Sequence, residues 1–477
     1  MGQLHDLTAL EQAAAIRARE VSAVELTEHY LRRSDSLSPA VGAFITITPG
    51  TALEQARTVD DLVSSTNDLS NLSALAGVVC PTKDLNQVAG VRCTFGSKAL
   101  QITATADDNV VARMRAEGLV FTGTTNTPEF GLPCYTENDI APAARTPWDL
   151  TRSAGGSSGG AAAAVAAGLA PMAQGSDGGG SIRIPASVCG LVGIKPARGR
   201  VSNGPLPEGL GELAVQGPIA RTVRDAAALL DAMAGGYPDD PFVAAPPNES
   251  FLSAANREPG TLRIGCYRSP VIADTQVHPD CIDAYERTLA LLAELGHVIE
   301  EIEPPFGHQA VESFEALWSV GAASIPIPPD RESELLPLTR WLRGRGRELS
   351  GTDITRALAV TRSVARAAIV ATAGYDVIVT PTLAQPPAVI GSIRNDADPA
   401  ADFEAQKSFT PFTAPYNITG QPAMTLPLHR TDSGLPIGTQ FIGRPRDERT
   451  LITLGAQLEQ AHPWLGWVPE IWGESLG

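Results

Sequence analysis

Residues 155–185 read GGSSGGAAAAVAAGLAPMAQGSDGGGSIRIP, a stretch dominated by glycine, alanine and serine. Consecutive glycines have no side chains to pack and lose more backbone entropy on folding than other residues, so a dense run of them indicates a specific structural or functional requirement. One such reason is a backbone that approaches a ligand closely. The three glycines at 178–180, just before Ser181, can point several N–H groups at one developing negative charge. The alanine-rich segment 161–173 is predicted to form a helix with little side-chain bulk that packs tightly under this loop.

The same stretch also contains a competing pattern. Residues 155–159 match the G-x-S-x-G nucleophile elbow, which normally follows a buried strand, whereas residues 147–154 (PWDLTRSA) do not read as a strand. That elbow needs a histidine partner. None of the downstream histidines lies in a motif, and two of them, His278 and His297, are expected at the surface; the five are His278, His297, His308, His429 and His462. A histidine-dependent triad is therefore the weaker alternative.

Phosphate and metal sites find little support in the sequence. No G-x-x-x-x-G-K-[ST] pattern occurs, and Gly209-x-Gly211-x-x-Ala214 lacks the strand that should precede a dinucleotide-binding loop. Histidines and cysteines never cluster, so no metal is expected. The six cysteines form no C-x-x-C pair and are typical of reduced thiols, which favours the cytoplasm.

Lysine is rare here and occurs only at positions 83, 98, 195 and 407 among 36 basic residues. A buried lysine, unlike arginine, can lose its proton and deprotonate a serine. Lowering its pKa from about 10.4 to near 7 corresponds to a penalty of about 4–5 kcal/mol against the charged form. Lys83 follows the apolar run 75–82, a predicted buried strand, and is the best candidate. Lys98 and Lys407 lie in polar contexts typical of the surface, and Lys195 favours a structural role.

Helix and strand patterns interleave along the chain. Two capping boxes, Thr8 with Glu11 and Ser22 with Glu25, predict helices near the N-terminus. Residues 258–303 read as strand, helix and strand, and residues 376–380 as a further buried strand. The segment 304–350 is predicted to be irregular, because prolines and clustered charges interrupt it. The whole pattern predicts an α/β fold with a single large mixed, mostly parallel β-sheet covered by helices on both faces.

Composition excludes several classes of protein. The chain has 477 residues, of which 43% are hydrophobic, and this is far too apolar for a disordered chain. Its formal net charge of −17, without any basic run, argues against nucleic acid and against an anionic membrane surface as partners. The longest apolar stretch, residues 161–173, is too short to span a bilayer.

Several separate motifs resemble the amidase signature family. The glycine-serine block at 155–183, Lys83-Asp84 with Gly96-Ser97, and residues 126–129 (NTPE), 203–205 (NGP) and 438–443 (GTQFIG) occur in the family's order. The resemblance covers most of the chain. It implies the amidase signature fold in one domain over residues 1–477, with a catalytic core at about 70–230 and a variable, substrate-facing segment at about 304–350.

The resemblance also implies a Ser–cis-Ser–Lys triad. By position, Ser181 resembles the nucleophile, Ser157 resembles the bridging serine that follows a cis peptide bond, and Lys83 resembles the general base. The N–H groups from Gly178, Gly179 and Gly180 to Ser181 resemble the oxyanion hole. Residues that shape this loop are expected at Ser158, Asp177 and Arg183.

The resemblance is less specific about the residues that contact the substrate. Gly131, Leu132 and Pro133 should border the acyl pocket, and Trp318 either lines it or is an ordinary core aromatic residue. Few charged residues lie near these positions in the sequence, which favours an uncharged aryl or alkyl group.

The implied reaction is hydrolysis of the C–N bond of a small carboxylic amide, linear or cyclic, to an acid and an amine or ammonia through a serine acyl-enzyme. Neither a metal nor an organic cofactor is implied. Two alternatives stay open: the amidase subunit of a tRNA-dependent amidotransferase, and an esterase or carbamate hydrolase of the same family. A degenerate binding protein is disfavoured because all three triad positions are present. The expected partner is a small amide, and a homodimer is one assembly considered.

Overall fold

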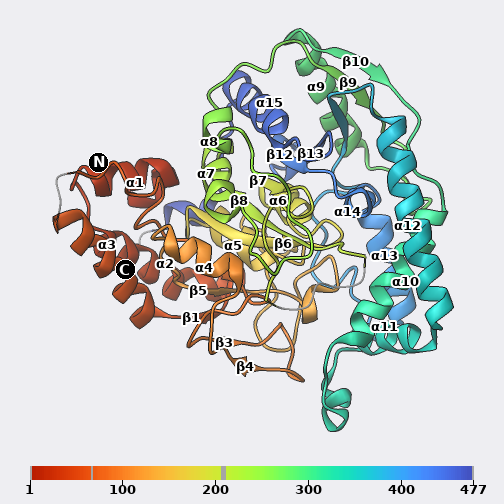
Figure 1. Ribbon diagram of the computed structural model, residues 1–477, viewed down its shortest axis with the longest axis horizontal. Helices are drawn as coiled ribbons and strands as arrows, with labels where there is room; N and C mark the ends of the chain where they lie inside the picture. Colours follow the sequence, from red (N-terminus) through yellow and green to blue (C-terminus); the bar gives the residue numbers. More distant parts are fainter. Residues whose placement is uncertain (1–2, 66–67, 206–210, 475–477) are drawn as a thin grey trace.

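An eight-stranded sheet runs through the middle of the computed structural model, which describes residues 3–65, 68–205 and 211–474 (Figure 1). The strands are ordered β10-β9-β11-β13-β12-β7-β8-β6 across the sheet. Their bounds are β6 Met172–Asp177, β7 Val192–Lys195, β8 Val215–Ala220, β9 Arg263–Cys266, β10 Val298–Glu301, β11 Val377–Pro381, β12 Ala423–Arg430 and β13 Pro436–Gly443.

The sheet is mixed, as predicted, but the prediction that it is mostly parallel is wrong. Only β9 runs parallel to its neighbours, β10 and β11, whereas the other adjacent strands in the sheet pair antiparallel. The reason lies in the connections. The tight turn between β12 and β13, closed by the Thr431 N–H to the Leu435 carbonyl at 2.8 Å, joins two strands that must run in opposite directions. The β9–β10 connection, by contrast, is a helical crossover of the kind that parallel neighbours require.

That crossover confirms the predicted βαβ unit. Helix α9 (Pro279–Glu294) joins β9 to β10, with Pro279 in its first turn. Gly296 follows the helix end at φ +89°, a left-handed conformation that glycine adopts without steric penalty. The predicted strand at 376–380 is also confirmed as β11, which is buried along its length.

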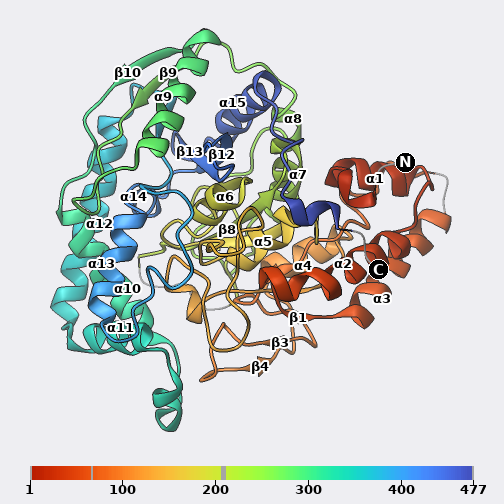
Figure 2. The same cartoon turned by 180° about the vertical axis from the view of Figure 1, so that it is seen from behind.

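Helices cover both faces of the sheet (Figures 1 and 2). One face packs on α7 (Val223–Met233), α9 and α15 (Glu448–Ala461), where Val377 and Val379 of β11 join the main core. The opposite face packs on α5 (Gly159–Ala166), α6 (Arg183–Cys189) and α14 (Pro415–Thr419), where Ile378 packs near Tyr416. This alternation is what a strand buried on both faces requires.

Helix α5 is shorter than the predicted helix at 161–173. It ends at Ala166, Gly168 then takes φ +68°, and Pro171 precedes the first residue of β6. The helix is fully buried, and no side chain in it is larger than valine. The predicted tight packing is therefore confirmed, because the small side chains let the backbone of α5 approach its neighbours closely.

The helices and strands within residues 9–125 form a layer beside the sheet (Figure 1). Both predicted capping boxes are confirmed at the starts of α1 and α2. The apolar run at 75–82 is buried, but only Thr82 belongs to a strand and Val79 forms an isolated bridge, because turns occupy residues 74–77. The elements are α1 Ala9–Arg17, α2 Ala23–Val41, β1 Phe44–Ile47, α3 Pro49–Ser65, β2 Thr82–Lys83, β3 Arg92–Cys93, β4 Ile102–Thr103, α4 Asn109–Ala116 and β5 Gly123–Thr125.

Segment 304–350 is helical, so the prediction that it is irregular is wrong. Pro329 and Pro337 do not interrupt helices but begin them, since the first helical turn needs no backbone N–H. Its clustered charges pair across turns, as between Glu332 and Arg343 at 2.9 Å. The helices on this side of the molecule are α10 Gln309–Ser324, α11 Pro337–Glu348, α12 Gly351–Ala371 and α13 Pro399–Phe409.

The remaining elements are short: η1 Leu4–Asp6, η2 Glu129–Gly131, α8 Phe251–Ala254, η3 Pro329–Glu334 and η4 Glu470–Gly473. Among the described helices, none combines the length and the apolar character needed to cross a bilayer.

Candidate active site

Lys83 ends the short strand β2 with its side chain entirely buried. Its Nζ donates hydrogen bonds to Ser157 Oγ at 2.7 Å and to Ser176 Oγ at 3.0 Å. Its backbone N–H donates to Gln174 Oε1 at 2.7 Å, which fixes the strand against β6. Burial lowers the pKa of Lys83 to about 7, and the nearby carboxylate of Asp177 offsets part of that effect. The amine is therefore close to half neutral near pH 7.

Ser157 lies just before α5 and is buried beside Lys83. The Gly156–Ser157 peptide bond is cis. A Cβ atom on Gly156 would lie 2.7 Å from the Tyr135 backbone, so only glycine fits where these two segments cross. The next residue, Ser158, donates its backbone N–H to the Ser181 carbonyl at 3.2 Å, which holds the two serine-containing loops together.

Ser158 has a second contact that links the same loops. Its Oγ donates to the Ser176 carbonyl at 3.2 Å and accepts the Ser176 N–H at 3.2 Å. Ser176 in turn contacts Lys83, so these hydrogen bonds connect all three segments that carry the predicted triad. Ser181 itself lies between β6 and α6 and is 7% exposed.

Asp177 and Arg183 form a fully buried ion pair under the glycine loop. Arg183 Nε donates to Asp177 Oδ2 and Arg183 Nη2 to Asp177 Oδ1, both at 2.9 Å. Burial alone would raise the pKa of the Asp177 carboxyl, but the Arg183 charge and hydrogen bonds from Arg183 and Asn417 hold that pKa well below its usual range. Asn417 Nδ2 donates to Asp177 Oδ1 at 2.9 Å. This pair therefore ties the loop to α14 as well as to α6.

The Asp177 carboxylate also fixes the glycine loop directly. Gly180 N–H donates to Asp177 Oδ1 at 2.7 Å, so this predicted oxyanion-hole donor is already engaged. Among the described residues, by contrast, nothing accepts a hydrogen bond from the N–H groups of Gly178, Gly179 or Ser181. The loop therefore has three neighbouring donors without an acceptor among the described residues, whereas the Gly180 N–H, which is also predicted for the oxyanion hole, is hydrogen-bonded to Asp177.

Two cavities adjoin the predicted triad. The smaller, of about 70 Å³, is lined by Ser181 and Gly179 together with Leu132, Pro133 and Trp318. The larger, of about 310 Å³, is lined by Ser157, Ser176 and Gly178 together with Gly131, Leu132 and Trp318. All four residues predicted to contact substrate are thus placed at the cavities beside the two serines.

Trp318 is not an ordinary core residue, since it borders both cavities. It stacks on Phe314 with the ring centroids 5.2 Å apart, and a Cβ atom on Gly178 would lie 3.1 Å from its ring. Both aromatic residues come from α10, so the segment at 304–350 does face the cavities although it is helical. Sequence reasoning missed Phe314. Its spacing of four residues from Trp318, which places both on one helix face, is the signal that would have found it.

Lys407 is a second correction, because it is not a surface residue. Only 16% of its side chain is exposed, and it borders the smaller cavity. Its Nζ forms ion pairs with Glu315 Oε1 at 2.7 Å and Glu404 Oε1 at 2.6 Å. Lys98 is exposed as predicted. Lys195 is fully buried and donates to the Pro196 carbonyl at 3.0 Å, and burial lowers its pKa to about 7 as well.

Histidine does not take part in this arrangement. None of the described residues that line the two cavities is a histidine. His297, predicted at the surface, is 6% exposed and makes hydrogen bonds with Leu262 and Gln457 instead. Within the described part of the chain, no group of three or more His, Cys, Asp or Glu side chains is arranged to hold a metal ion.

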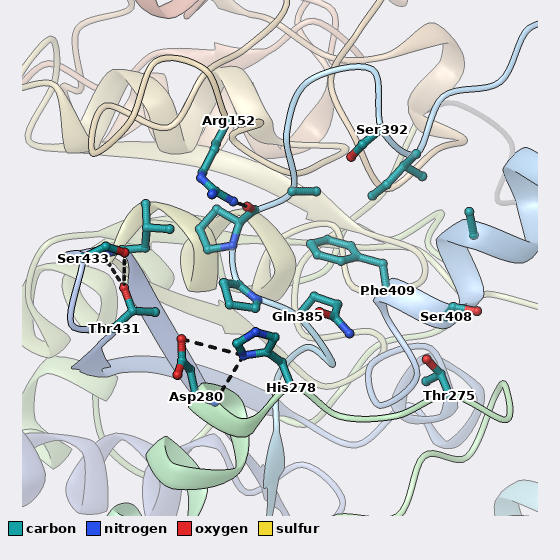
Figure 3. Close-up of a pocket in the computed structure, with 16 residues that line it drawn as sticks. Arg152, Thr275, His278, Asp280, Gln385, Ser392, Ser408, Phe409, Thr431 and Ser433 are labelled. Atoms are coloured by element: carbon teal, nitrogen blue, oxygen red, sulfur yellow. Dashed lines mark hydrogen bonds and ion pairs between the residues drawn. The ribbon is translucent and has the colours of Figure 1, made fainter.

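A further hollow of about 700 Å³ lies on the other side of α13 and contains none of the predicted site residues. Figure 3 shows Arg152 reaching the Pro387 carbonyl at its upper edge, with His278 and Asp280 paired at its lower edge. Phe409 lines the same hollow.

A model of the amidase family matches residues 25–452. The chain belongs to the amidase signature family. This amidase is 34% identical to the 6-aminohexanoate-cyclic-dimer hydrolase of Paenarthrobacter ureafaciens, over 97% of this chain and 96% of that protein. It is also 34% identical to the acylamidase of Rhodococcus erythropolis, with the same shares of both chains.

Structural comparison agrees with the family assignment. The solved structure of a 6-aminohexanoate cyclic dimer hydrolase complexed with substrate superposes with a TM-score of 0.89 and 31% identity, and it covers 98% of this amidase and 100% of that chain. The predicted family and its fold are confirmed. The protein is thus an amidase, a hydrolase that acts on the C–N bond of carboxylic amides.

Proposed function

We propose that this amidase hydrolyses small amides with an uncharged aryl or alkyl acyl group through an acyl-enzyme on Ser181. The observation that carries the proposal is the 2.7 Å hydrogen bond between Lys83 Nζ and Ser157 Oγ, made by a fully buried amine. A lysine with its pKa near 7 can serve as a base at neutral pH, as histidine does in other serine hydrolases.

In the acylation step, neutral Lys83 accepts the Ser157 hydroxyl proton while Ser157 accepts the proton of Ser181. Ser181 Oγ then forms a bond to the substrate carbonyl carbon. In this scheme the carbonyl oxygen becomes an oxyanion, which accepts hydrogen bonds from the N–H groups of Gly178, Gly179 and Ser181. Each such donor typically contributes about 3 kcal/mol to transition-state stabilisation.

Collapse of the tetrahedral intermediate breaks the C–N bond. The leaving nitrogen takes a proton from Ser157, and Ser157 recovers one from the Lys83 ammonium. Water then attacks the acyl-enzyme by the same proton route and releases the acid and Ser181. Arg183 and Asp177 act as positioning residues in this scheme, because they hold the Gly180 amide and the loop around it.

The smaller cavity supports an uncharged acyl group. Its walls include Phe314, Trp318 and Phe403, and the charge of Lys407 is balanced there by Glu315 and Glu404. The named relatives act on 6-aminohexanoate cyclic dimer and on acylamides, which are also amides. Esters and carbamates with similar acyl groups are a second candidate class, since the same nucleophile attacks their carbonyl carbon.

The test is to assay the purified protein on a panel of anilides, alkyl amides, esters and carbamates, and to trap the acyl-enzyme for intact-mass analysis. We expect turnover by the protein alone, a mass increase equal to the acyl group, and loss of both in Ser181→Ala. Turnover of glutamine alone, dependent on a partner protein, would favour the amidotransferase subunit. Undiminished amide hydrolysis by Ser181→Ala would refute the acyl-enzyme.

We also propose that residues 1–477 act as one amidase domain, that the protein works in the cytoplasm and that it forms a homodimer. All six cysteines are free and buried, which suits a reducing compartment. Light scattering of the purified protein tests the homodimer directly, since a mass near that of one chain would refute it.

A further inference from the structure

The two serines of the predicted triad line different cavities. Ser181 lines only the smaller cavity, whereas Ser157 lines only the larger one. In the proposed function, on which this inference rests, Ser157 returns the proton to the leaving nitrogen. The amine half of the substrate must therefore lie on the Ser157 side, in the cavity of about 310 Å³, and the acyl half on the Ser181 side.

Glu212 contributes a carboxylate to the lining of the larger cavity. Its backbone has φ +51°, in the left-handed region that side-chain-bearing residues rarely occupy. Its carboxylate forms an ion pair with Arg198, whose Nε lies 3.9 Å from Oε2, beyond hydrogen-bond distance. Arg198 Nε donates instead to the Glu212 carbonyl at 2.8 Å. Within the described chain, no donor lies within hydrogen-bond distance of the Glu212 carboxylate.

Asn203 supplies a second acceptor on the same wall. Its Nδ2 donates to the Ala214 carbonyl at 3.0 Å, and this bond fixes the orientation of the side-chain amide. Its Oδ1 is buried and has no hydrogen-bond partner among the described residues. A buried acceptor without a donor is unfavourable by about 1–3 kcal/mol, so a ligand that brings an N–H to it is favoured.

The rest of this cavity is largely apolar. Its walls include Leu85, Phe130, Leu213, Leu317 and Ile325. No lysine or arginine is among the described residues that line it. An alkyl chain suits these walls, and the two acceptors suit a nitrogen that carries N–H donors at the end of that chain. A positive charge on this nitrogen is attracted by Glu212 and by the net charge of −17 on the whole protein.

We propose that the cavity beside Ser157 is a leaving-group subsite that selects amines bearing a second, protonated primary amine, bound by Glu212 and Asn203. The preferred substrates are then amides of short alkyl diamines, in which an uncharged acyl group occupies the Ser181 cavity. Glu212 is the specificity-determining residue for the amine half of the substrate.

The test compares two amides that share the butanoyl group. N-(3-aminopropyl)butanamide carries a terminal ammonium at neutral pH, whereas N-butylbutanamide has a methyl group in its place. We expect the wild-type protein to favour the aminopropyl amide in kcat/KM by about tenfold or more, as a charged hydrogen bond allows. Glu212→Gln should reduce that preference to less than about threefold, chiefly by raising KM for the aminopropyl amide.

Glu294→Gln is the matched control, because it makes the same chemical change at an exposed position near the end of α9. It should keep the wild-type preference. Equal kcat/KM for the two amides in the wild type, or a preference that survives Glu212→Gln, would overturn the inference.

Binding of the free amines gives a second readout that does not require turnover. By calorimetry, butylamine, whose amine is protonated near neutral pH, should bind the wild type more tightly than uncharged 1-butanol, and Glu212→Gln should remove the difference. Equal binding of butylamine and 1-butanol by the wild type would also overturn the inference. The proposed function fails separately, if Ser181→Ala still hydrolyses either amide at the wild-type rate.

Discussion

The amine nitrogen of Lys83 lies 2.7 Å from the hydroxyl oxygen of Ser157, and the lysine side chain has no exposed surface. Burial of this kind favours the neutral amine, because a charged ammonium loses its hydration. The pair therefore places a base beside a hydroxyl without any histidine. Its consequences for pH dependence and for stability differ, and each can be measured.

The first prediction concerns the pH profile. Because the base is active only when neutral, kcat/KM should fall as pH drops below about 7 and should level off above it. Lys83→Met should lower kcat by a factor of about 100 or more and remove this dependence. Lys195 is the control, since burial lowers its pKa to about 7 as well. Lys195→Met should keep the midpoint of the pH profile near 7. A shifted midpoint in that variant would mean that the profile reports the titration of Lys195 and not of Lys83.

The second prediction is that Lys83→Met stabilises the fold. The pKa of Lys83 falls from 10.5 to about 7 on folding, so the unfolded state binds more protons between these values. The contribution of Lys83 to the free energy of unfolding therefore rises with pH across that window and is least favourable below it. A shift of roughly 3 units corresponds to about 4 kcal/mol, which the loss of hydrogen bonds to Ser157 and Ser176 offsets in part.

We therefore expect the free energy of unfolding of Lys83→Met to exceed that of the wild type by about 2 kcal/mol near pH 7. The gain should shrink as pH approaches about 10, where the unfolded lysine also becomes neutral. Urea unfolding at both pH values measures it. A less stable Lys83→Met at neutral pH would show that the lysine holds the fold together, contrary to this account.

The third prediction separates the stability of a buried ion pair from its effect on the glycine loop. Asp177→Asn leaves the Arg183 guanidinium buried without its counter-charge and weakens the acceptor of the Gly180 N–H. We expect the free energy of unfolding to fall by about 3–5 kcal/mol. The kcat should also fall by a factor of about 100, because the loop no longer presents its donors in place.

Glu448→Gln is the matched control for that variant. Glu448 pairs with Arg200 at 2.9 Å, both side chains are buried, and neither residue lines the two cavities. It should lose comparable stability while kcat, corrected for the folded fraction, stays within about twofold of the wild type. Equal losses of kcat in the two variants would mean that Asp177 acts only on stability.

The fourth prediction tests the contact between Gly131 and Ser157. Gly131 has φ +69°, and an added Cβ atom would lie 3.1 Å from Ser157 Oγ and 2.7 Å from Leu85 Cδ1. Gly391 has φ +77° but nothing within 4 Å of the same atom. Both alanine variants should lose about 1 kcal/mol of stability from the left-handed backbone. Only Gly131→Ala should also lower kcat, by about tenfold to a hundredfold, since Ser157 must move.

Features that depend on local pattern could be predicted from the sequence. Lys83, Ser157 and Ser181 belong to motifs whose residue types and order are specific, and the structure brings Lys83 and Ser157 into contact. Capping boxes and the βαβ unit were likewise readable, because helix starts and crossover helices depend on neighbours in the chain. The roles of the three triad residues stay predictions until the variants above are measured.

Features that depend on distant contacts could not be predicted. Strand direction in the sheet is set by which strands meet, and the antiparallel β11–β13 pair joins residues far apart in sequence. Lys407 has a polar sequence context, yet Glu315 of α10 pairs with it, and its side chain lines the same cavity as Ser181. Gly180 has its N–H engaged because the Asp177 carboxylate folds back under the loop, which no spacing rule reveals.

Helix α10 places Phe314 and Trp318 against the catalytic loop, although the predicted triad lies more than a hundred residues earlier in the chain. Part of the cavity wall is thus encoded in a different part of the gene from the predicted triad. Randomising a few codons on one turn of α10 should yield enzymes with new substrate ranges, while the proton-transfer machinery is inherited intact.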